Sequence, residues 1–363
     1  MINSTTTDIT IIHLINDLNV INSGPSKSII ALHEQTKNYV NSEVWSLTPF
    51  YSDDSSIKSY ESSLSIYFLK EILKIRKLRH VIHLHGMWHY NHLIIYLLSR
   101  FTKLNIIHSP RGSFSPVALK QGKKKFKSFF LSVFRILSKN IKAFIVTSEN
   151  EKNDVKKIFP KIENFVFSNF SLTPSASKIN KKLNQYIYVG RIDPIKNLKN
   201  LFLSWHQFSQ LKSDAELIII GDFNVKYHEE LEMLIKKHNI NNISFIGTKD
   251  GDKKFKYIQE SKFLILPSLD ENFGMVILEA LLSNTPVLVS DKLRWNDVVD
   301  NKCGLIFDPY DVTSIVYSLK KSYELSYSEY QSMENNIKKY LMKKYPVDKI
   351  SKEYVDFYYK FAQ

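Results

Sequence analysis

Short apolar runs alternate with amphipathic helical patterns along the whole chain of 363 residues. In the first half, each apolar run has the length of one buried strand, and a stretch with helical spacing follows it. This order predicts a parallel sheet covered by helices on both faces. The strand-like runs are residues 9–15, 81–85, 105–108 and 143–147, and the helical patterns are residues 65–78, 91–101 and 125–137.

The alternation stops in a polar segment and then starts again. Residues 171–184 (SLTPSASKINKKLN) have no apolar period, which is typical of a linker. We therefore expect an α/β chain with two doubly wound Rossmann-like domains, at 1–170 and 185–345, and a final helix at 346–363. A cleft between such domains is the default place for a ligand. The later strand-like runs are residues 186–189, 217–220, 243–246, 263–266, 287–289 and 305–307.

Composition limits the class of protein. Apolar residues make up 44% and charged residues 24%, as in soluble globular proteins, and the 10 glycines and 11 prolines exclude collagen-like or Pro/Gly-rich disordered chains. The single Cys303 excludes an intramolecular disulfide and a cysteine-cluster zinc site, and it fits a reducing compartment. The start lacks a signal-peptide pattern, and no apolar stretch has membrane-spanning length. These features predict a cytoplasmic protein that meets a membrane only as a peripheral protein.

Positive charge is concentrated in the first half of the chain. The whole chain has a net charge of +14, and residues 1–180 contribute +12 of it, with 24 basic and 12 acidic residues. Between Lys70 and Lys142, 16 basic residues are accompanied by a single acidic residue, Glu71. Such a half indicates an anionic partner: nucleic acid, a membrane surface or a phosphorylated substrate.

The most specific motif is PSLDENFGMVILEA at residues 267–280. A polar loop with Glu271 and Asn272 follows a strand-like run, and Gly274 opens an apolar helix that contains Glu279. The free N–H groups of the first helical turn can bind a diphosphate, and a glycine there lets the ligand approach the backbone. The two carboxylates can accept hydrogen bonds from two sets of hydroxyls on one extended ligand. In the alternative interpretation, Glu271 only offsets the helix dipole and Glu279 lies on the surface.

Two glycine turns also follow strand-like runs. VGRIDPIKN, residues 189–197, places Arg191 and Lys196 in a loop before a helix, and such a pair is common around phosphate oxygens. NSGPS, residues 22–26, places Gly24 where the backbone can pass close to a phosphate. Solvated loop charges and an ordinary turn are the alternatives. The GxGxxG and GxxxxGK[ST] patterns are absent, which disfavours the usual dinucleotide and P-loop interpretations.

Two motifs of the first half follow the second and third strand-like runs. HLHGMWH, residues 83–89, makes His85 a candidate for an acid–base or acceptor contact, with packing histidines as the alternative. SPRGS, residues 109–113, would direct Arg111 into the same crevice.

No metal is expected at either of two candidate places. H-x-H on one strand supplies two ligands at most, and no neighbouring cysteine or carboxylate completes a site. Asp250-Gly251-Asp252 looks like the DxD pattern that holds a metal near a nucleotide-sugar, but its place before a helix favours turn and N-cap roles.

A basic segment, KQGKKKFK, extends from Lys120 to Lys127 and is followed by Phe129 and Phe130. This partly amphipathic segment predicts docking on an anionic membrane surface, where each nearby cation adds about 1 kcal/mol. A solvated face is the alternative.

Together, these motifs resemble the retaining glycosyltransferases of the GT-B fold, in particular glycosyltransferase family 4 (glycosyl transferases group 1). PSLDENFGMVILEALLSNTPVLVS is similar to the family's Glu-x7-Glu signature, with Glu271 and Glu279 as its carboxylates, and VGRIDPIKNL is similar to its diphosphate-binding Arg/Lys loop. HLHGMW and HSPRGSFSPVALKQGKKK are similar to a subgroup common in bacterial surface-polysaccharide synthesis. The resemblance covers essentially the whole chain. It implies two domains that face each other across a cleft and a C-terminal helix that crosses back to the first domain.

The resemblance also implies roles for the matched residues. Arg191 and Lys196 would neutralise the diphosphate of a nucleotide-sugar. Glu271 would hold sugar hydroxyls, and Glu279 would bind the nucleotide ribose. The remaining contacts are implied for Gly24 with the diphosphate, for Gly247 and Thr248 with the base, and for Asn272, Phe273, Gly274 and Met275 with the sugar and phosphate.

Some positions depart from the family pattern. Many relatives carry His-Gly where this chain has Arg111-Gly112, and there the His contacts donor sugar and acceptor. Both His85 and Arg111 therefore remain candidates for the acceptor contact. Relatives often have glycine where Asn197 and Asn284 stand, and Asn tolerates a left-handed backbone better than other non-glycine residues.

The implied activity is transfer of a hexosyl group from a nucleoside diphosphate-sugar, with a UDP-sugar favoured, to a saccharide acceptor, with retention at the anomeric carbon. A lipid-diphosphate-linked acceptor in O-antigen, capsule or exopolysaccharide synthesis is expected from the subgroup. Arg191, Lys196 and the helix start at Gly274 would stabilise the leaving diphosphate without a metal or another cofactor. Two alternatives stay open: another GT-B enzyme, such as a nucleotide-sugar epimerase or a phosphorylase, and a basic nucleic-acid-binding protein. The second lacks a recognisable RNA or DNA module.

Overall fold

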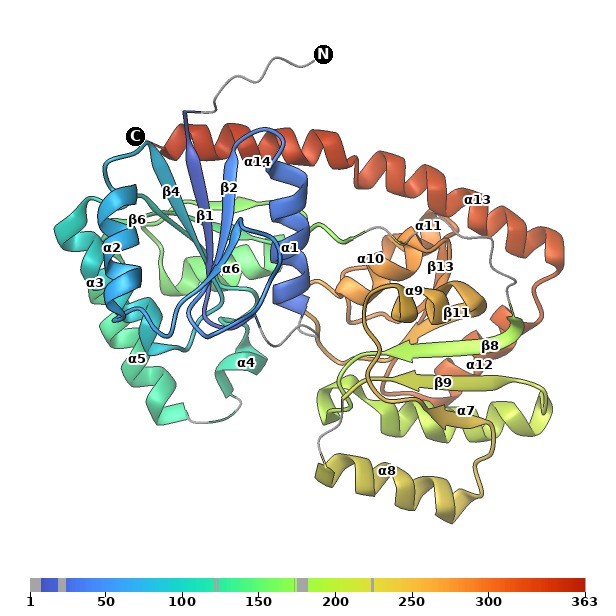
Figure 1. Cartoon of the computed structure of the whole chain (residues 1–363). Helices are drawn as coiled ribbons and strands as arrows, with labels where there is room; N and C mark the ends of the chain where they lie inside the picture. The colour runs from blue at the N-terminus through green and yellow to red at the C-terminus, as the bar shows by residue number, and fades with distance from the viewer. Residues whose placement is uncertain are drawn as a thin grey trace. The chain divides into compact units, whose positions relative to one another are not determined.

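The computed structural model describes residues 8–18, 24–120, 122, 124–172, 174, 182–222 and 225–362 (Figure 1). Contacts divide the chain into two units: unit 1 is Met1–Ser171 with Val347–Gln363, and unit 2 is Leu172–Pro346. Asn22, Ser23, Gln121 and Lys123 lie outside the described residues, as do residues 173 and 175–181 of the expected linker.

Unit 1 is built on a seven-stranded parallel sheet with the order β3-β2-β1-β4-β5-β6-β7. The winding reverses between β1 and β4, which places the two strands side by side at the switch point of the sheet. The strands are β1 (Thr10–Ile15), β2 (Asn41–Ser46), β3 (Ile57–Ser59), β4 (His80–His85), β5 (Ile106–Ser109), β6 (Ile141–Val146) and β7 (Asn164–Val166).

Helices cover both faces of this sheet. Figure 1 shows α1 on one side of the strands and α2, α3 and α5 on the other. Side-chain caps start two of the helices: Ser65 accepts from the backbone N–H of Phe68, and Ser148 from that of Glu151. The helices are α1 (Gly24–Thr36), α2 (Ile66–Ile75), α3 (Tyr90–Thr102), α4 (Pro116–Lys120), α5 (Lys124–Leu137), the 3-10 helix η1 (Ser138–Asn140), α6 (Glu149–Ile158) and α14 (Val347–Phe361).

Unit 2 has a six-stranded parallel sheet with the order β10-β9-β8-β11-β12-β13, so its switch point lies between β8 and β11. The central strands β11 and β12 are buried throughout and mostly apolar, as expected where helices cover both faces of a parallel sheet. The strands are β8 (Lys182–Val189), β9 (Glu216–Ile220), β10 (Ile243–Phe245), β11 (Ser261–Leu266), β12 (Val287–Ser290) and β13 (Gly304–Phe307).

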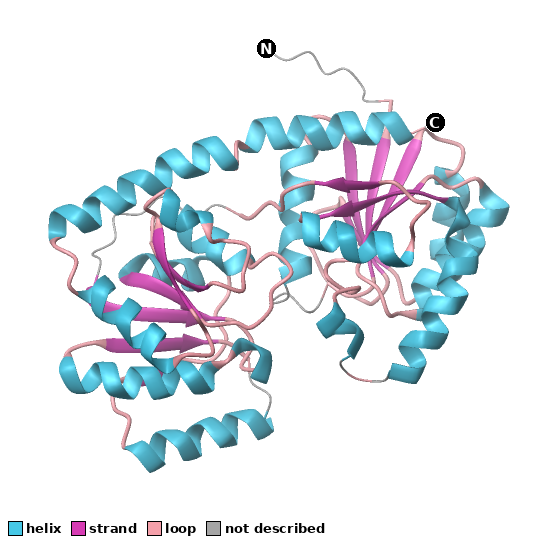
Figure 2. Cartoon of the chain, turned by 180° about the vertical axis from the view of Figure 1, so that it is seen from behind, coloured by secondary structure: helices cyan, strands magenta, loops and turns pink. Residues whose placement is uncertain are grey.

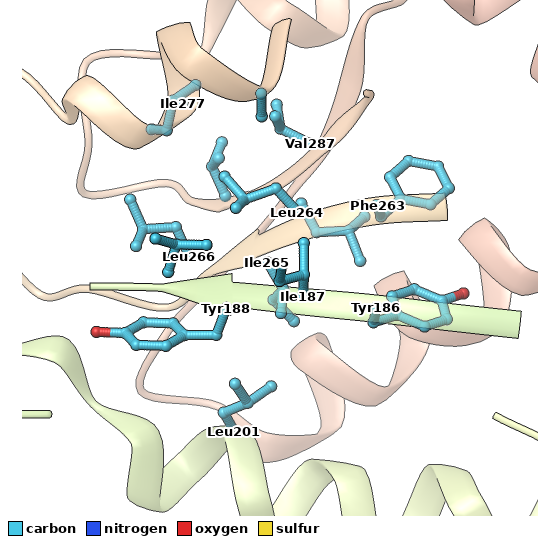
Figure 3. Packing of buried hydrophobic residues seen from close by; sticks show 14 of the residues in the cluster. Tyr186, Ile187, Tyr188, Leu201, Phe263, Leu264, Ile265, Leu266, Ile277 and Val287 are labelled. Atoms are coloured by element: carbon cyan, nitrogen blue, oxygen red, sulfur yellow. The ribbon is translucent and has the colours of Figure 1, made fainter. Parts of the chain in front are cut away.

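The helices of unit 2 also lie on both sides of their sheet (Figure 2). Figure 3 shows the layers from close by: Leu201 packs on one side of Ile187 and Tyr188 of β8, and Ile277 lies beyond β11 on the other. The helices are the 3-10 helix η2 (Pro194–Lys196), α7 (Leu198–Leu211), α8 (Val225–His238), α9 (Gly251–Glu260), α10 (Met275–Leu282), α11 (Asp297–Asp300), α12 (Val312–Tyr323) and α13 (Tyr327–Lys344).

The predicted fold class is confirmed, since both sheets are parallel and doubly wound. All ten predicted strands are present, with ends that differ by a few residues. The sequence did not predict β2, β3 and β7. β8 begins at Lys182, so the expected linker 171–184 is wrong at its end, because the first residues of this strand are polar and basic. Among the described residues, no helix combines the length and the apolar character that a membrane span requires.

Candidate functional site

The loops after β8 and β11 meet at the carboxyl edge of unit 2, where an open α/β sheet usually binds its ligand. Lys196 comes from the first loop and Glu271 from the second, and Lys196 Nζ lies 2.5 Å from Glu271 Oε1. Ser268 Oγ donates to the same carboxylate oxygen at 2.9 Å. The Lys196 and Glu271 side chains are 13% and 17% exposed, so this ion pair is shielded but accessible to a ligand.

Local hydrogen bonds hold both loops in place. Asp193 begins η2, and its side chain accepts from the backbone N–H of Ile195 at 3.1 Å. The Ile195 carbonyl in turn accepts from the backbone N–H of Leu269 at 2.9 Å, which joins the two loops directly. Asn197 ends η2 in the left-handed region at φ 57°, and Asn284 has φ 55°. The prediction that Asn provides left-handed backbone at these two places is confirmed.

Arg191 follows β8 on the same edge and is exposed. The Tyr188 hydroxyl donates to the Arg191 carbonyl at 2.7 Å, which fixes the backbone beneath the side chain. No carboxylate of the described residues pairs with this guanidinium. Arg191 therefore offers an unpaired fork of donors near the Lys196–Glu271 pair.

The N-terminus of α10 completes this edge. Gly274 stands at its N-cap position with φ 78°, and no side chain caps the helix. A Cβ at this position would lie 3.0 Å from Ile277 Cδ1 and 3.2 Å from Trp295 Nε1. Trp295 Nε1 donates to the Phe273 carbonyl at 2.6 Å, and this hydrogen bond fixes the backbone of the loop just before the helix. Two further predicted contact residues, Asn272 and Met275, are half-buried here.

Asp270 adds to the charge balance of this loop. Burial raises the pKa of its carboxyl, and the negative charge of Glu271 raises it further, while Arg294 and Lys196 act in the opposite direction. The carboxylates are therefore crowded at this loop, and cations are needed around them.

Glu279, the second carboxylate of the motif, is buried inside α10 rather than on the surface, so the surface alternative is wrong. Its Oε1 lies 2.6 Å from Nζ of Lys254, which comes from α9. Sequence reasoning missed Lys254. The available signal was its spacing, because Lys254, Phe255 and Ile258 share the buried face of α9.

The carboxyl ends of β8, β9 and β10 carry glycines, which allows close backbone approach. A Cβ on Gly221 would lie 1.8 Å from the Gly190 carbonyl oxygen. The Gly221 N–H donates to the Gly247 carbonyl at 3.2 Å. Gly247 itself has φ 68° with open space around it, and both Gly247 and Thr248 are exposed.

Asp250 occupies the N-cap position of α9, as predicted, but its side chain makes no capping hydrogen bond. Asp252 lies in the first turn of that helix. Among the described residues, the His, Cys, Asp and Glu groups close enough to hold a metal are His13/His83/His85 and His33/Glu34/Asp54, and the Asp250-Gly251-Asp252 turn belongs to neither.

In unit 1, three buried histidines lie at the switch point: His13 on β1, and His83 and His85 on β4. The H-x-H of β4 supplies two of these rings, as expected of one strand, and the β1–β4 register adds a third, His13, which the sequence did not predict. Burial is the main cause that lowers the pKa of all three rings well below the usual value, so they are neutral at pH 7.

Arg111 sets the direction of the hydrogen bonds in this cluster. Its Nη2 lies 3.2 Å from His85 Nδ1, and a guanidinium can only donate, so His85 Nδ1 is the acceptor. The proton of the neutral His85 ring is then on Nε2, which donates to His13 Nδ1 at 3.2 Å. Both nitrogens of His85 are occupied, and Arg111 also donates to Asn169 Oδ1. Arg111 has a left-handed backbone with φ 55°.

The third ring connects β4 to the C-terminal helix of unit 1. His83 Nδ1 lies 2.9 Å from the Tyr358 hydroxyl of α14, and its Nε2 lies 2.8 Å from Ser109 Oγ. Both ring nitrogens of His83 and of His85 therefore have partners, whereas His13 Nε2 is buried with no hydrogen-bond partner among the described residues. Gly24 begins α1 and is half-buried.

The basic segment from Lys120 to Lys127 leads into α5, where its cations differ in environment. Lys127 Nζ donates to the Ala118 carbonyl at 2.5 Å and lies 5.2 Å from the ring centre of Trp88, so this ammonium is directed inward. Lys125 is exposed, and so are Phe129 and other apolar side chains of the helix. Those exposed apolar side chains are Phe126, Phe129 and Ile136.

Residues 170–340 match the family model described as Glycosyl transferases group 1. This segment contains the Lys196–Glu271 pair and the α10 N-terminus. This part of the chain belongs to the group 1 glycosyl transferases.

Two curated bacterial proteins are similar to more than half of this chain. An uncharacterised 41.2 kDa protein in the cps region of Klebsiella pneumoniae is 27% identical over 70% of this chain and 73% of its own. The O-antigen chain mannosyltransferase RfbU of Salmonella typhimurium is 25% identical over 55% of this chain and 56% of its own. Three other curated glycosyltransferases are matched over only 25% to 44% of their own length, so the chain spans less than half of them.

The fold of this chain is that of GT-B glycosyltransferases, with two Rossmann-like α/β domains. The structure of HepE from Anabaena in complex with UDP aligns with a TM-score of 0.72, over 96% of this chain and 99% of HepE. Sequence identity in that alignment is 14%, so the likeness shows the fold alone.

Proposed function

We propose that this chain transfers a hexosyl group from a nucleoside diphosphate-sugar to a hydroxyl of a saccharide acceptor, with retention at the anomeric carbon. The observation that carries the proposal is the accessible Lys196–Glu271 pair at the switch point of unit 2. On the same edge lie Arg191, which forms no ion pair with the carboxylates that the structure describes, and the N-terminus of α10, which has no side-chain cap there. Two cations and free N–H groups suit a diphosphate, and a carboxylate beside them suits sugar hydroxyls.

In the proposed reaction, Lys196 exchanges part of its contact with Glu271 for a diphosphate oxygen, and Glu271 accepts hydroxyl hydrogens of the sugar. Charge develops on the diphosphate as the glycosidic bond breaks. Arg191, Lys196 and the N–H groups at the start of α10 stabilise that charge, so the step needs no metal. The acceptor oxygen attacks from the face that the leaving group vacates, and a phosphate oxygen takes its proton.

This front-face route requires no pair of acid and base carboxylates, unlike a glycosidase. It also agrees with the state of His85, whose two ring nitrogens are already hydrogen bonded. In this proposal His85 and Arg111 shape the acceptor side of unit 1, and neither removes the acceptor proton.

Two similar proteins support the proposed substrate class. HepE is a solved structure of this fold that holds UDP, which favours a UDP-sugar as donor. RfbU is an O-antigen chain transferase, which favours a role in bacterial surface-polysaccharide synthesis. In that role the acceptor would be a saccharide carried on a lipid diphosphate, and the enzyme would work at the inner face of the membrane.

Helix α5 would provide the membrane contact. Its exposed Phe126, Phe129 and Ile136 can enter the headgroup region, and the cations beside them attract anionic lipid. The excess charge of residues 1–180 supports this placement, because it lies in the half that does not hold the Lys196–Glu271 pair.

A thermal-shift screen with UDP, GDP and ADP tests the donor site. One of the three should stabilise unit 2, by about 2.7 kcal/mol at a hundredfold excess over Kd. The matching labelled nucleotide-sugars are then incubated with and without a saccharide-lipid extract. Acceptor-dependent transfer supports the proposal. Conversion of the donor without acceptor would replace it with the epimerase alternative.

A further inference from the structure

A lysine on the buried face of α9 calls for an explanation. Lys254 shares that face with Phe255 and Ile258, where an apolar residue would normally pack. A buried ammonium is costly unless a counter-charge meets it. The ammonium of Lys254 meets one on the neighbouring helix, α10.

The counter-charge is Glu279. Lys254 Nζ lies 2.6 Å from Glu279 Oε1, and the two side chains are 3% and 6% exposed. Replacing a buried ion pair by apolar residues of similar volume is often neutral or stabilising, so stability alone gives no reason for these charges. Their position in unit 2 supplies another reason.

Lys254 and Glu279 come from the helices that follow two loops of the candidate site. α9 begins just after the exposed Gly247 and Thr248 at the end of β10, and α10 begins just after Gly274. Both loops leave the carboxyl edge of one parallel sheet. The ion pair therefore joins α9, which follows the loop expected to contact the base, to α10, which follows the loop expected to contact the sugar and phosphate.

We propose that Lys254 is a positioning residue that fixes the Glu279 carboxylate and thereby sets the preference of this site for a ribose over a deoxyribose. Its ammonium holds Oε1, and Oε2 accepts a hydrogen bond from a ribose hydroxyl of the nucleotide. This inference rests on the proposed function, which supplies the nucleotide. It goes further by assigning a residue to the choice between ribonucleotide and deoxyribonucleotide.

The test is a set of dissociation constants for UDP, 2′-deoxy-UDP and 3′-deoxy-UDP, measured by titration calorimetry with the full chain. A hydrogen bond to a charged group is worth roughly 1.5–3 kcal/mol, so wild type should bind one deoxy analogue about 10- to 100-fold more weakly than UDP. In Lys254→Met that ratio should fall to about threefold or less. Glu279→Gln should show a similar fall, and adding Lys254→Met to it should change the ratio no further.

Lys253→Met is the matched control, because Lys253 is the exposed neighbour on the same helix. It should keep the wild-type ratio. Lys254→Gln is the second variant in case Lys254→Met does not fold, since its amide can still donate to Oε1; its ratio should lie between those of wild type and Glu279→Gln. A merely structural role would lower the unfolding temperature and the affinity for all three nucleotides together, leaving the ratio unchanged.

The outcomes separate the two claims. An unchanged ratio in Lys254→Met or Lys254→Gln overturns the inference and leaves the proposed function intact. A wild type that binds UDP and both deoxy analogues equally also overturns only the inference. A wild type that binds none of UDP, GDP and ADP overturns the proposed function itself.

Discussion

The two sheets wind in the same way, yet the switch points at their carboxyl edges carry different chemistry. In unit 2, charged Lys196 and Glu271 meet after β8 and β11 and remain partly exposed. In unit 1, the corresponding place between β1 and β4 holds three neutral, buried imidazoles, and Arg111 from the loop after β5 donates to one of them.

The difference separates two tasks. An accessible ion pair can exchange partners with a charged ligand. Its two groups are already held in place and largely shielded from water, so little reorganisation is needed when the ligand binds. A histidine whose two nitrogens are hydrogen bonded inside the sheet edge cannot do so without breaking its packing. Charge stabilisation in the reaction is therefore expected from unit 2, while unit 1 is expected to contribute a rigid surface and its excess positive charge.

The largest effect should follow from breaking the ion pair of unit 2. Lys196→Ala and Glu271→Ala should each lower transfer from a labelled donor by about 100-fold or more, the usual cost of removing one group that stabilises developing charge. Lys199→Ala is the control, because Lys199 is an exposed lysine one turn further on. Near-wild-type transfer rates in both Lys196→Ala and Glu271→Ala would contradict the proposed role of the Lys196–Glu271 pair in transfer.

The backbone contacts beneath the same edge should be the next most sensitive feature. Gly221→Ala puts a Cβ within 1.8 Å of the Gly190 carbonyl, so the two strand ends must separate. We expect a loss of about 2–3 kcal/mol in the free energy of unfolding, as for other overpacked sites. Gly247→Ala is the control: it meets open space, and only its φ of 68° opposes the substitution, at a cost of about 1 kcal/mol. Equal losses in denaturant unfolding of the two variants would contradict this account.

The sequence predicted what depends on local pattern. It placed Lys196 and Glu271 in loops after strands, and parallel strands bring such loops to one edge. It did not predict the contact of Lys254 with Glu279 or the addition of His13 to the β4 histidines. Both depend on register and helix packing between segments far apart in the chain, which local periodicity does not encode. β3 (IKS) and β7 (NFV) were missed because each is a three-residue strand with polar residues and without a buried position, whereas the equally short β10 (ISF) continues into the apolar Ile246.

The buried histidines make unit 1 the more acid-sensitive part. Burial lowers the pKa values of His13, His83 and His85, and lowers that of His92 to about 4 and that of His108 to about 3. Below pH 6.5 these histidines bind protons in the unfolded chain but not in the folded chain. The free energy of unfolding therefore falls as the pH decreases, by up to about 1.4 kcal/mol per pH unit for each histidine. Hydrogen exchange between pH 7 and pH 5 should show loss of protection in unit 1 before unit 2.

A substitution tests the assignment of that pH dependence. His83→Gln should reduce the loss of protection in unit 1 between pH 7 and pH 5, because one proton-binding difference is removed. His206→Gln in unit 2 is the control and should leave the pH dependence of unit 1 unchanged. Equal pH dependence in the two units of wild type would contradict the comparison of their edges.

The smallest effect concerns the outer surface of unit 1. Lys125→Gln removes one exposed cation beside the apolar side chains of α5, which should weaken binding to anionic vesicles about fivefold, the equivalent of about 1 kcal/mol. The affinity for a nucleoside diphosphate should not change, since that site is assigned to unit 2. Sedimentation with vesicles that contain phosphatidylglycerol measures the first quantity, and calorimetry the second.

Lys236→Gln is the control for this surface, because Lys236 is an exposed lysine on α8 of unit 2. It removes the same net charge from the chain, so a general charge effect would weaken vesicle binding equally in both variants. A specific effect of α5 appears only in Lys125→Gln, and adding Phe129→Ser should weaken binding further, since that ring is 68% exposed. If the wild-type protein does not bind the vesicles but binds nucleic acid in a salt-dependent manner, the excess positive charge of unit 1 contacts nucleic acid and not a membrane.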